Sequence, residues 1–295
     1  MKSLNYLLLL TLFIIVFHSK NAIATSTETL ISLARDNMQT KLDDAQMYIE
    51  QALELAPEHP EANFLCGRIM GQQASDAFFS ALSYAKKSLN CLQKAVTFAP
   101  NDVDYQLGLF NFYIGAPRIA GGDMKLAREQ VDIIRYLDAL AGAKAELILL
   151  SESEQTTLLE SHYQRYRQQF PNVAAIHLRH GLYLQKQNDY ERAYQALLAA
   201  TQSSQIDDDY YNSLYQLGRN AVFSQAQVDT GIESLLAFVE QYPLAKAVPP
   251  LEWAYLRLAQ LYQLNNQPDK VALYTTLAKS SSDRDLHRAL RNLKD

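Results

Sequence analysis

A glycine-rich stretch at residues 111–130, NFYIGAPRIAGGDMKLAREQ, holds residue types that could bind a phosphate group. A Walker-type loop needs a lysine followed by Ser or Thr behind its glycines, and it opens off a strand. Here Leu126 follows Lys125, and the flanking residues have the spacing of helices. A GxGxxG dinucleotide fingerprint is absent from the stretch as well. The sequence therefore predicts an expanded turn between two helices, and no cofactor is expected.

The backbone conformation expected of this turn explains why glycine, proline and aspartate occur in it. Gly115 can end one helix and Pro117 prevents it from continuing, while Gly121 and Gly122 allow the chain to reverse. Asp123 then has the place and the chemistry of an N-cap for the helix MKLAREQ. Whether the polar side chains of the turn also contact a partner stays open. The insertion loop consists of Pro117, Arg118, Gly121, Gly122 and Asp123.

Other residues that could do chemistry lack the partners they would need. His177 and His180 are spaced i, i+3 and could share a helix face, but no Glu or Cys nearby on that helix completes a tetrahedral metal site. We expect one packed and one solvated histidine. Residues 207–209, DDD, lack the glycine and closing glutamate of a calcium loop and fit the start of a helix instead. No serine sits in a GxSxG elbow, and neither cysteine precedes a recognisable histidine partner. We expect no metal site, because the histidines and the DDD run lack further ligands, and these absent motifs together favour a protein that is not an enzyme.

The N-terminal residues 1–24 have the pattern of a cleaved secretory signal peptide. Lys2 gives a positive start, the uncharged run YLLLLTLFIIVF follows, and AIA precedes a cleavage site before Thr25. An uncleaved membrane anchor is the alternative, but the apolar run is short of the ~20 residues that a spanning helix needs. The sequence therefore predicts a periplasmic or secreted protein without a membrane span after cleavage.

The charge balance narrows the class of partner. The formal net charge is −5, and removal of the two lysines of the signal would make it about −7. A net anion is not attracted to nucleic acid or anionic lipid, so neither is expected as the main partner.

A repeat of about 34 residues runs through the chain. In HLRHGLYLQKQNDYERAYQALLAA, Gly181 is followed by Ala193 twelve residues later and by Ala200 nineteen residues later. LRLAQLYQLNNQPDKVALYTTLAK repeats this spacing from Ala259. Earlier segments show the pattern more weakly. The small-residue positions of the first helices are Leu33, Cys66/Gly67, Gly108, Leu147, Gly181, Gly218 and Ala259.

These residues and spacings resemble the tetratricopeptide repeat family, whose repeat is a pair of antiparallel helices. The resemblance implies an all-α, right-handed superhelical solenoid of about seven helical hairpins, as a single domain over residues 25–295. Its enlarged repeats would lie at about 58–100 and 101–138. The insertion, of the form aP-x-x-GG-D, and the segment YQLGR also resemble secreted bacterial repeat proteins.

Physical chemistry supports the same architecture. Apolar residues recur every three or four positions, as in amphipathic helices, and almost no window shows the alternation of a strand. One helical pair cannot bury both of its faces, so neighbouring pairs must stack. Stacked hairpins offer no deep pocket for catalytic groups, which favours a binding protein over an enzyme.

In the resembled family, fixed positions of each first helix line a concave groove. In this sequence those positions are occupied largely by aromatic residues, with a few cationic ones. Such residues suit a surface that binds an extended peptide or a partner helix. Insertions in the second and third repeats can rotate these positions, so we expect about half of the side chains to be exposed. They are Phe64, Arg68, Tyr105, Phe112, Tyr113, Lys144, Leu178, Tyr215, Arg219, Phe223 and Trp253.

Two cysteines, Cys66 and Cys91, fall in facing helices of the enlarged second repeat. They could be buried free thiols, or they could form a disulfide in an oxidising compartment. The function predicted from these observations is an exported, non-catalytic scaffold that binds protein or peptide segments. The alternative is a module for a small apolar ligand or lipid, enclosed by the insertions of the second and third repeats, and a hydrolase ranks last.

Overall fold

The computed structural model describes residues 26–242 and 247–293, and its regular elements are all helices. The predicted all-α class is therefore confirmed for this part of the chain. The predicted signal peptide at residues 1–24 and its cleavage site before Thr25 lie outside the described residues. No helix within the described ranges has the length and apolar character needed to cross a bilayer. The chain divides into two compact units with a boundary between Asp123 and Met124, and each is treated by itself.

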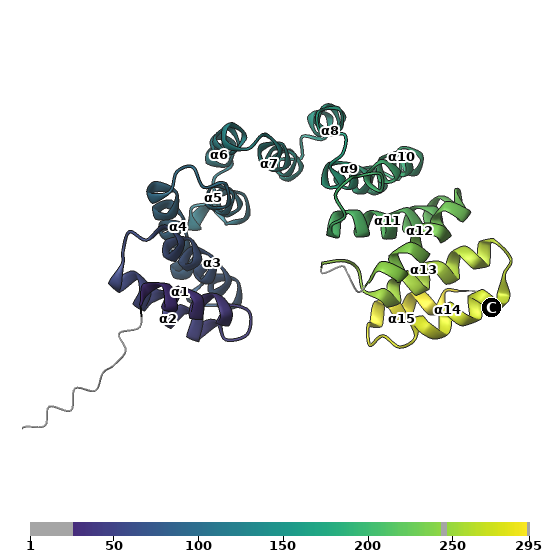
Figure 1. Cartoon of the computed structure of the whole chain (residues 1–295), viewed down its shortest axis with the longest axis horizontal. Coiled ribbons are helices and arrows are strands. Elements are labelled where there is room, and N and C mark those ends of the chain that lie inside the picture. Colours follow the sequence, from purple (N-terminus) through teal and green to yellow (C-terminus); the bar gives the residue numbers. More distant parts are fainter. Residues whose placement is uncertain (1–25, 243–246, 294–295) are drawn as a thin grey trace, which may run out of the picture. The chain divides into compact units, whose positions relative to one another are not determined.

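The first compact unit contains two hairpins and one further helix (Figure 1). Helix α1 packs against α2 and α3 against α4, while α5 packs on both α3 and α4. Its elements are α1 (Thr27–Asn37), α2 (Leu42–Leu55), α3 (Pro60–Asp76), α4 (Ala81–Phe98), α5 (Val103–Gly115) and the 3₁₀ turn η1 (Arg118–Ala120).

Close backbone contact holds the enlarged α3/α4 hairpin together. A Cβ on Gly67 would lie 2.5 Å from Cγ of Leu92, so only glycine allows this approach. Beside it, the hydroxyl of Ser88 donates a buried hydrogen bond of 2.6 Å to the carbonyl oxygen of Gly67. A disulfide joins Cys66 to Cys91 with their Cα atoms 5.9 Å apart, so the two cysteines are not free thiols in this structure. The longest hairpin of this unit is thus fixed by packing and by a covalent bond.

The glycine-rich insertion closes on itself through backbone hydrogen bonds. Gly121 has a φ of 107°, in the left-handed region that glycine tolerates. A Cβ on Gly122 would lie 1.8 Å from the carbonyl oxygen of Ala116. The N–H groups from residue 120 to 123 all donate within this unit: Ala120 and Gly122 to Pro117, Gly121 to Arg118, and Asp123 to Tyr113. Because these donors are used, they are not turned toward a phosphate, in agreement with the predicted turn.

The second compact unit contains the hairpins α9/α10, α11/α12 and α13/α14, and α15 packs on α13. Before them, α6 packs against α7, α7 against α8 and α8 against α9. The elements are α6 (Met124–Leu137), α7 (Ala139–Glu152), α8 (Thr156–Gln169), α9 (Ala174–Lys186), α10 (Tyr190–Ala200), α11 (Asp208–Ser224), α12 (Val228–Gln241), α13 (Leu251–Leu264), α14 (Pro268–Ala278) and α15 (Arg284–Arg291).

Small residues of the repeat lie where the helices of this unit touch. A Cβ on Gly181 would meet Leu197 at 2.6 Å, and one on Gly218 would meet Leu235 at 2.2 Å. These contacts pair a first helix with its own second helix, as the repeat spacing predicts. The third repeat is different, because the boundary of the compact units falls between α5 and α6. Within the first unit, Gly108 packs instead against Phe64.

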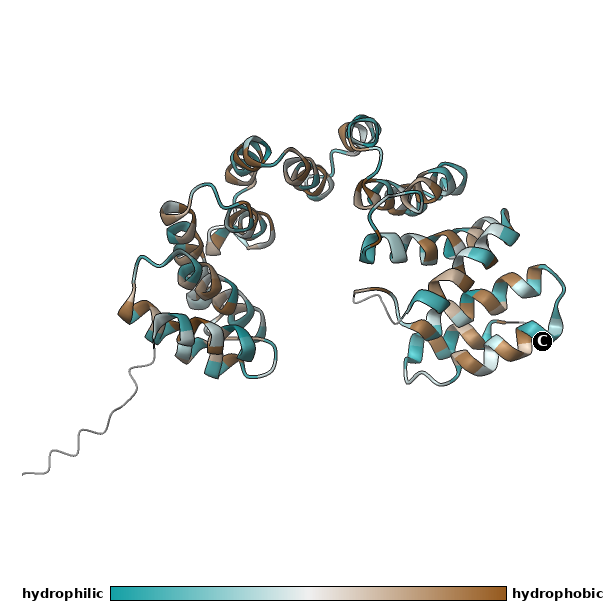
Figure 2. Ribbon diagram, in the orientation of Figure 1, coloured by the Kyte–Doolittle hydropathy of each residue, from teal (hydrophilic) through white to brown (hydrophobic). Residues whose placement is uncertain are grey.

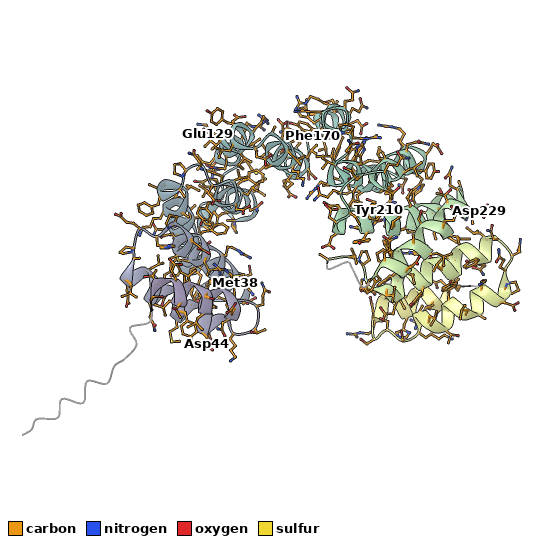
Figure 3. All side chains as sticks on the ribbon, viewed as in Figure 1. Met38, Asp44, Glu129, Phe170, Tyr210 and Asp229 are labelled. Carbon is orange, nitrogen blue, oxygen red and sulfur yellow. A yellow bond between two sulfur atoms is a disulfide. The ribbon has the colours of Figure 1, made fainter. Side chains whose placement is uncertain are left out.

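Apolar stripes along the helices form the core of each unit. Figure 2 shows hydrophobic and hydrophilic residues together on the same helices, as amphipathic helices require. In the second unit, Tyr163, Tyr166 and Ile176 are buried in one cluster with residues of α7. Phe170, labelled in Figure 3, packs half-buried at the end of α8, and its ring centroid lies 6.2 Å from that of Tyr166.

Candidate functional site

Three first helices of the second unit, α9, α11 and α13, lie in a row, with α11 in contact with both others. Helix α11 begins at Asp208, and Tyr210 in its first turn is labelled in Figure 3. Asp207 caps it, since its Oδ1 accepts a hydrogen bond of 3.1 Å from the N–H of Tyr210. The predicted helix start at DDD is therefore confirmed. Side chains from α11 and α13 meet in a group that we call the arginine–aromatic cluster: Arg219, Phe223, Trp253 and Arg257.

The cluster alternates cations and rings. The guanidinium carbon of Arg219 lies 4.9 Å from the ring centroid of Phe223, and that of Arg257 lies 5.2 Å from the same ring. Arg257 also lies 5.5 Å from the ring of Trp253. Each distance is within the ~6 Å over which a ring face attracts a cation. Phe223 is 43% exposed, so the cluster reaches the surface.

Neighbouring polar groups hold the cluster in place. Arg219 Nη1 donates a hydrogen bond of 2.6 Å to Gln185 Oε1 on α9. The Gln185 amide is buried and donates in turn to Asn220 Oδ1 at 3.2 Å. At the other end, Trp253 Nε1 donates to Asp283 Oδ2 at 2.9 Å. The rotamers at both ends are therefore restrained before any ligand arrives.

No carboxylate of the described residues neutralises the positive charge of the cluster. Among the described residues, neither Arg219 nor Arg257 forms an ion pair with a carboxylate. Nε of Arg257 is buried and lacks a hydrogen-bond partner. Burial, together with the charge of Arg257, lowers the pKa of Arg219. Two like charges held against one ring favour the binding of an anion.

The other predicted groove residues of this unit differ in how far their side chains are buried. Leu178 and Tyr215 are buried in the core, so their side chains offer no groove surface. Lys144 on α7 is half-buried. Burial and Asp207 raise the pKa of Asp209, and the charges of Lys144 and Arg179 oppose that rise.

The first unit gathers a smaller aromatic group from the predicted residues. The rings of Phe64 and Tyr105 stack with centroids 4.6 Å apart, and Arg68 lies 6.0 Å from the centroid of Phe64. Phe112 is half-buried, whereas Tyr113 is buried. Phe64, Arg68 and Phe112 line a hollow of 520 Å³.

The two histidines belong to a buried polar network. Arg167 donates from Nε to His177 Nδ1 at 3.0 Å and from Nη1 to His180 Nδ1 at 3.3 Å. With both Nδ1 atoms accepting, Nε2 of His177 donates to the carbonyl oxygen of Pro171, and Nε2 of His180 to Glu160. Both histidines are buried, so the expectation that one is solvated was wrong. In residues 26–242 and 247–293, no group of three or more His, Cys, Asp or Glu could hold a metal.

Arg257 is the member of the cluster that sequence reasoning missed. It follows Trp253 by four residues, one helical turn along the same face, but it lies outside the positions carried over from the resembled family. A search for cations at i+4 from the predicted groove aromatics would have found it.

No protein-family profile matches the chain, and no curated protein does. Solved structures do match. Yeast Tom70 is similar with a TM-score of 0.64 at 14% identity, over 90% of this chain and 52% of that chain. The Cut9–Hcn1 heterotetramer of the APC/C is similar with a TM-score of 0.52 at 13% identity, over 94% of this chain and 50% of that chain. A tetratricopeptide repeat protein of Parabacteroides merdae matches with a TM-score of 0.48 at 12% identity, over 90% of this chain and 99% of that chain.

At these identities the likeness concerns the fold, which is an all-α solenoid of tetratricopeptide-like hairpins. The chain spans about half the length of the first two of these proteins. The number of seven hairpins stays a prediction, since α5 and α6 fall in different compact units.

Proposed function

We propose that this protein is an exported, non-catalytic scaffold that binds protein segments along the first-helix face of α9, α11 and α13. The observation that carries the proposal is the arginine–aromatic cluster, in which two guanidinium groups lie against an exposed ring and have no carboxylate partner among the described residues. Such a surface suits an extended segment that carries both carboxylate and apolar or aromatic side chains.

Binding would be passive but specific. The carboxylate of the partner would sit between Arg219 and Arg257, where it relieves their mutual repulsion. Apolar side chains would cover Phe223. Because Gln185 and Asp283 already restrain the ends of the cluster, little side-chain freedom is lost on binding.

Export is part of this proposal and rests mainly on the signal-like residues 1–24. A periplasmic or secreted location is consistent with a disulfide between Cys66 and Cys91, because disulfides persist in oxidising compartments. Fusion of residues 1–30 to a reporter that is active only after export tests it, and a reporter retained inside the cell would refute export.

A peptide-display selection against the purified protein tests the binding function. We expect enrichment of peptides that combine Asp or Glu with an aromatic residue. The double variant R219Q/R257Q should lose that enrichment, since glutamine keeps polarity but removes both charges. Tyr215 is a poor choice for this test because it is buried, and its removal would disturb the core.

The control variant R128Q/K270Q removes two exposed charges outside the cluster. It should retain the wild-type peptides. Equal enrichment by R219Q/R257Q and by wild type, or no enrichment by any of the three proteins, would overturn the proposed function.

A further inference from the structure

The two enlarged segments of the first unit meet at one apolar pocket. It has a volume of 550 Å³ and opens between the end of α3, the start of α4, the end of α5 and η1. Ala74 and Ala85 line it from the enlarged hairpin, while Phe112, Pro117 and Ile119 line it from α5 and the glycine-rich insertion. Its volume is within the range of pockets that enclose small molecules. The enlarged α3/α4 hairpin and the glycine-rich insertion therefore both contribute lining residues to this one pocket.

The lining offers little to a polar ligand. None of its residues carries a charge, and its polar side chains are those of Ser75 and Asn111. The hydroxyl of Ser75 already donates to the carbonyl oxygen of Gly71 at 3.2 Å. The N–H groups of Ala116 and Ala120 donate to carbonyl oxygens of the same segment. A peptide backbone would leave its own polar groups unpaired here, whereas an alkyl chain has none to satisfy.

Large apolar side chains stand exposed beside the pocket. Phe78 and Phe79 lie in the connection from α3 to α4, and they are 89% and 96% exposed. Their rings contact each other edge to face, with centroids 4.9 Å apart. Ile119, which lines the pocket, is 75% exposed. Apolar groups gathered in this way mark a binding site more often than a plain surface.

Unpaired positive charge lies next to the same residues. Arg118 stands in η1 between two lining residues, and Lys86 follows the lining residue Ala85. Both side chains are exposed. In the part of the chain that the structure describes, neither forms an ion pair.

We propose that this pocket binds the aliphatic chain of a single anionic amphiphile of the fatty-acid type. The chain fills the apolar recess, the carboxylate lies at the rim near Arg118, and Phe78 and Phe79 cover the exposed side of the chain. This site is separate from the arginine–aromatic cluster, which lies in the other compact unit. Its success or failure is therefore independent of the proposed peptide binding.

Calorimetric titration of the whole protein with dodecanoate, below its micelle concentration, tests the proposal. We expect saturable binding of one dodecanoate per chain. In a series of shorter fatty acids, affinity should rise about fourfold for each methylene group added while the pocket is filling. Dodecyltrimethylammonium, which has the same chain and the opposite charge, should bind at least tenfold more weakly.

Variants locate the site. Ala74→Phe and Ala85→Phe place a ring in the recess and should each weaken dodecanoate binding at least tenfold. Ala139→Phe, at an exposed position on α7, is the matched control and should leave it unchanged. Arg118→Gln should reduce the difference between the anionic and cationic ligands. Circular dichroism shows which variants keep the helical content of wild type, and dodecanoate binding is compared only among those variants.

Three results would overturn the proposal. The first is no saturable binding of dodecanoate by wild type. The second is undiminished binding by a folded pocket variant. The third is binding to phosphatidylglycerol vesicles, lost in the pair F78S/F79S, without binding of the monomeric fatty acid, since that pattern would define a membrane-docking tip instead.

Discussion

Replacing Gly218 by alanine tests whether close helix contact holds the hairpins of the second unit together. A Cβ at this position would lie 2.2 Å from Cγ and 2.4 Å from Cδ1 of Leu235 on the paired helix α12. At a separation below 3.0 Å some atom must move. Leu235 is completely buried, so its side chain has no free space to enter.

The expected effect is the difference between two opposing contributions. Overpacking a filled core destabilises by about 1–3 kcal/mol, and this contact, made by several atoms of one enclosed side chain, belongs at the upper end. Alanine returns about 1 kcal/mol because it favours the helix more than glycine does. Gly218→Ala should therefore lower the free energy of unfolding by about 2 kcal/mol.

Urea unfolding followed by circular dichroism measures this change. Gly115→Ala is the matched control, because no atom lies within 4 Å of the position that its methyl group would take, so the helix preference acts alone. It should leave stability unchanged or raise it by about 0.5 kcal/mol. In the double variant with Leu235→Ala the two losses should be less than additive, since the obstructing atoms are gone. A Gly218→Ala protein as stable as wild type, or strictly additive losses, would refute the packing argument.

Three further perturbations test other parts of the structure. Reducing the Cys66–Cys91 disulfide, which spans 25 residues, should lower the unfolding free energy by about 3 kcal/mol; an unchanged urea midpoint, or two alkylatable thiols in the unreduced protein, would contradict it. Burial, aided by the charge of Arg167, keeps the pKa of His177 below its ordinary 6.5, and burial does the same for His180. The unfolded chain then binds protons that the folded protein does not bind, so stability should fall as pH drops through about 6.5, more steeply than in His180→Gln; equal slopes would contradict the network. Gly122→Ala, whose Cβ would lie 1.8 Å from a carbonyl oxygen, should destabilise the first unit by at least about 2 kcal/mol in a thermal melt; wild-type stability would contradict the close turn.

The fold could be predicted because its physical causes are local. Apolar spacing indicates each helix, and small residues indicate where two helices touch, as Gly181 and Gly218 do. The contacts of the third repeat do not follow from its local spacing. Gly108 has the expected residue type, but within its compact unit it packs on Phe64, and nothing in the local spacing tells which neighbour a glycine meets.

The site could be predicted only in part. Position along a helix indicates a face, but burial depends on how neighbouring helices are rotated. For this reason Phe223 is exposed while Tyr215, eight residues earlier on the same helix, is buried. The hydrogen bonds that Arg167 donates to His177 and His180 join α8 to α9, and such contacts between helices have no signature in a single sequence.

The central claim is that Arg219 and Arg257 together receive a carboxylate of a bound peptide. Titration of one display-selected acidic peptide with wild type, R219Q/R257Q and R128Q/K270Q, at low and high salt, tests it most directly. We predict that R219Q/R257Q binds at least about tenfold more weakly than wild type and loses most of the salt dependence, while R128Q/K270Q binds as wild type does. Equal affinities for wild type and R219Q/R257Q, with the same dependence on salt, would contradict the account.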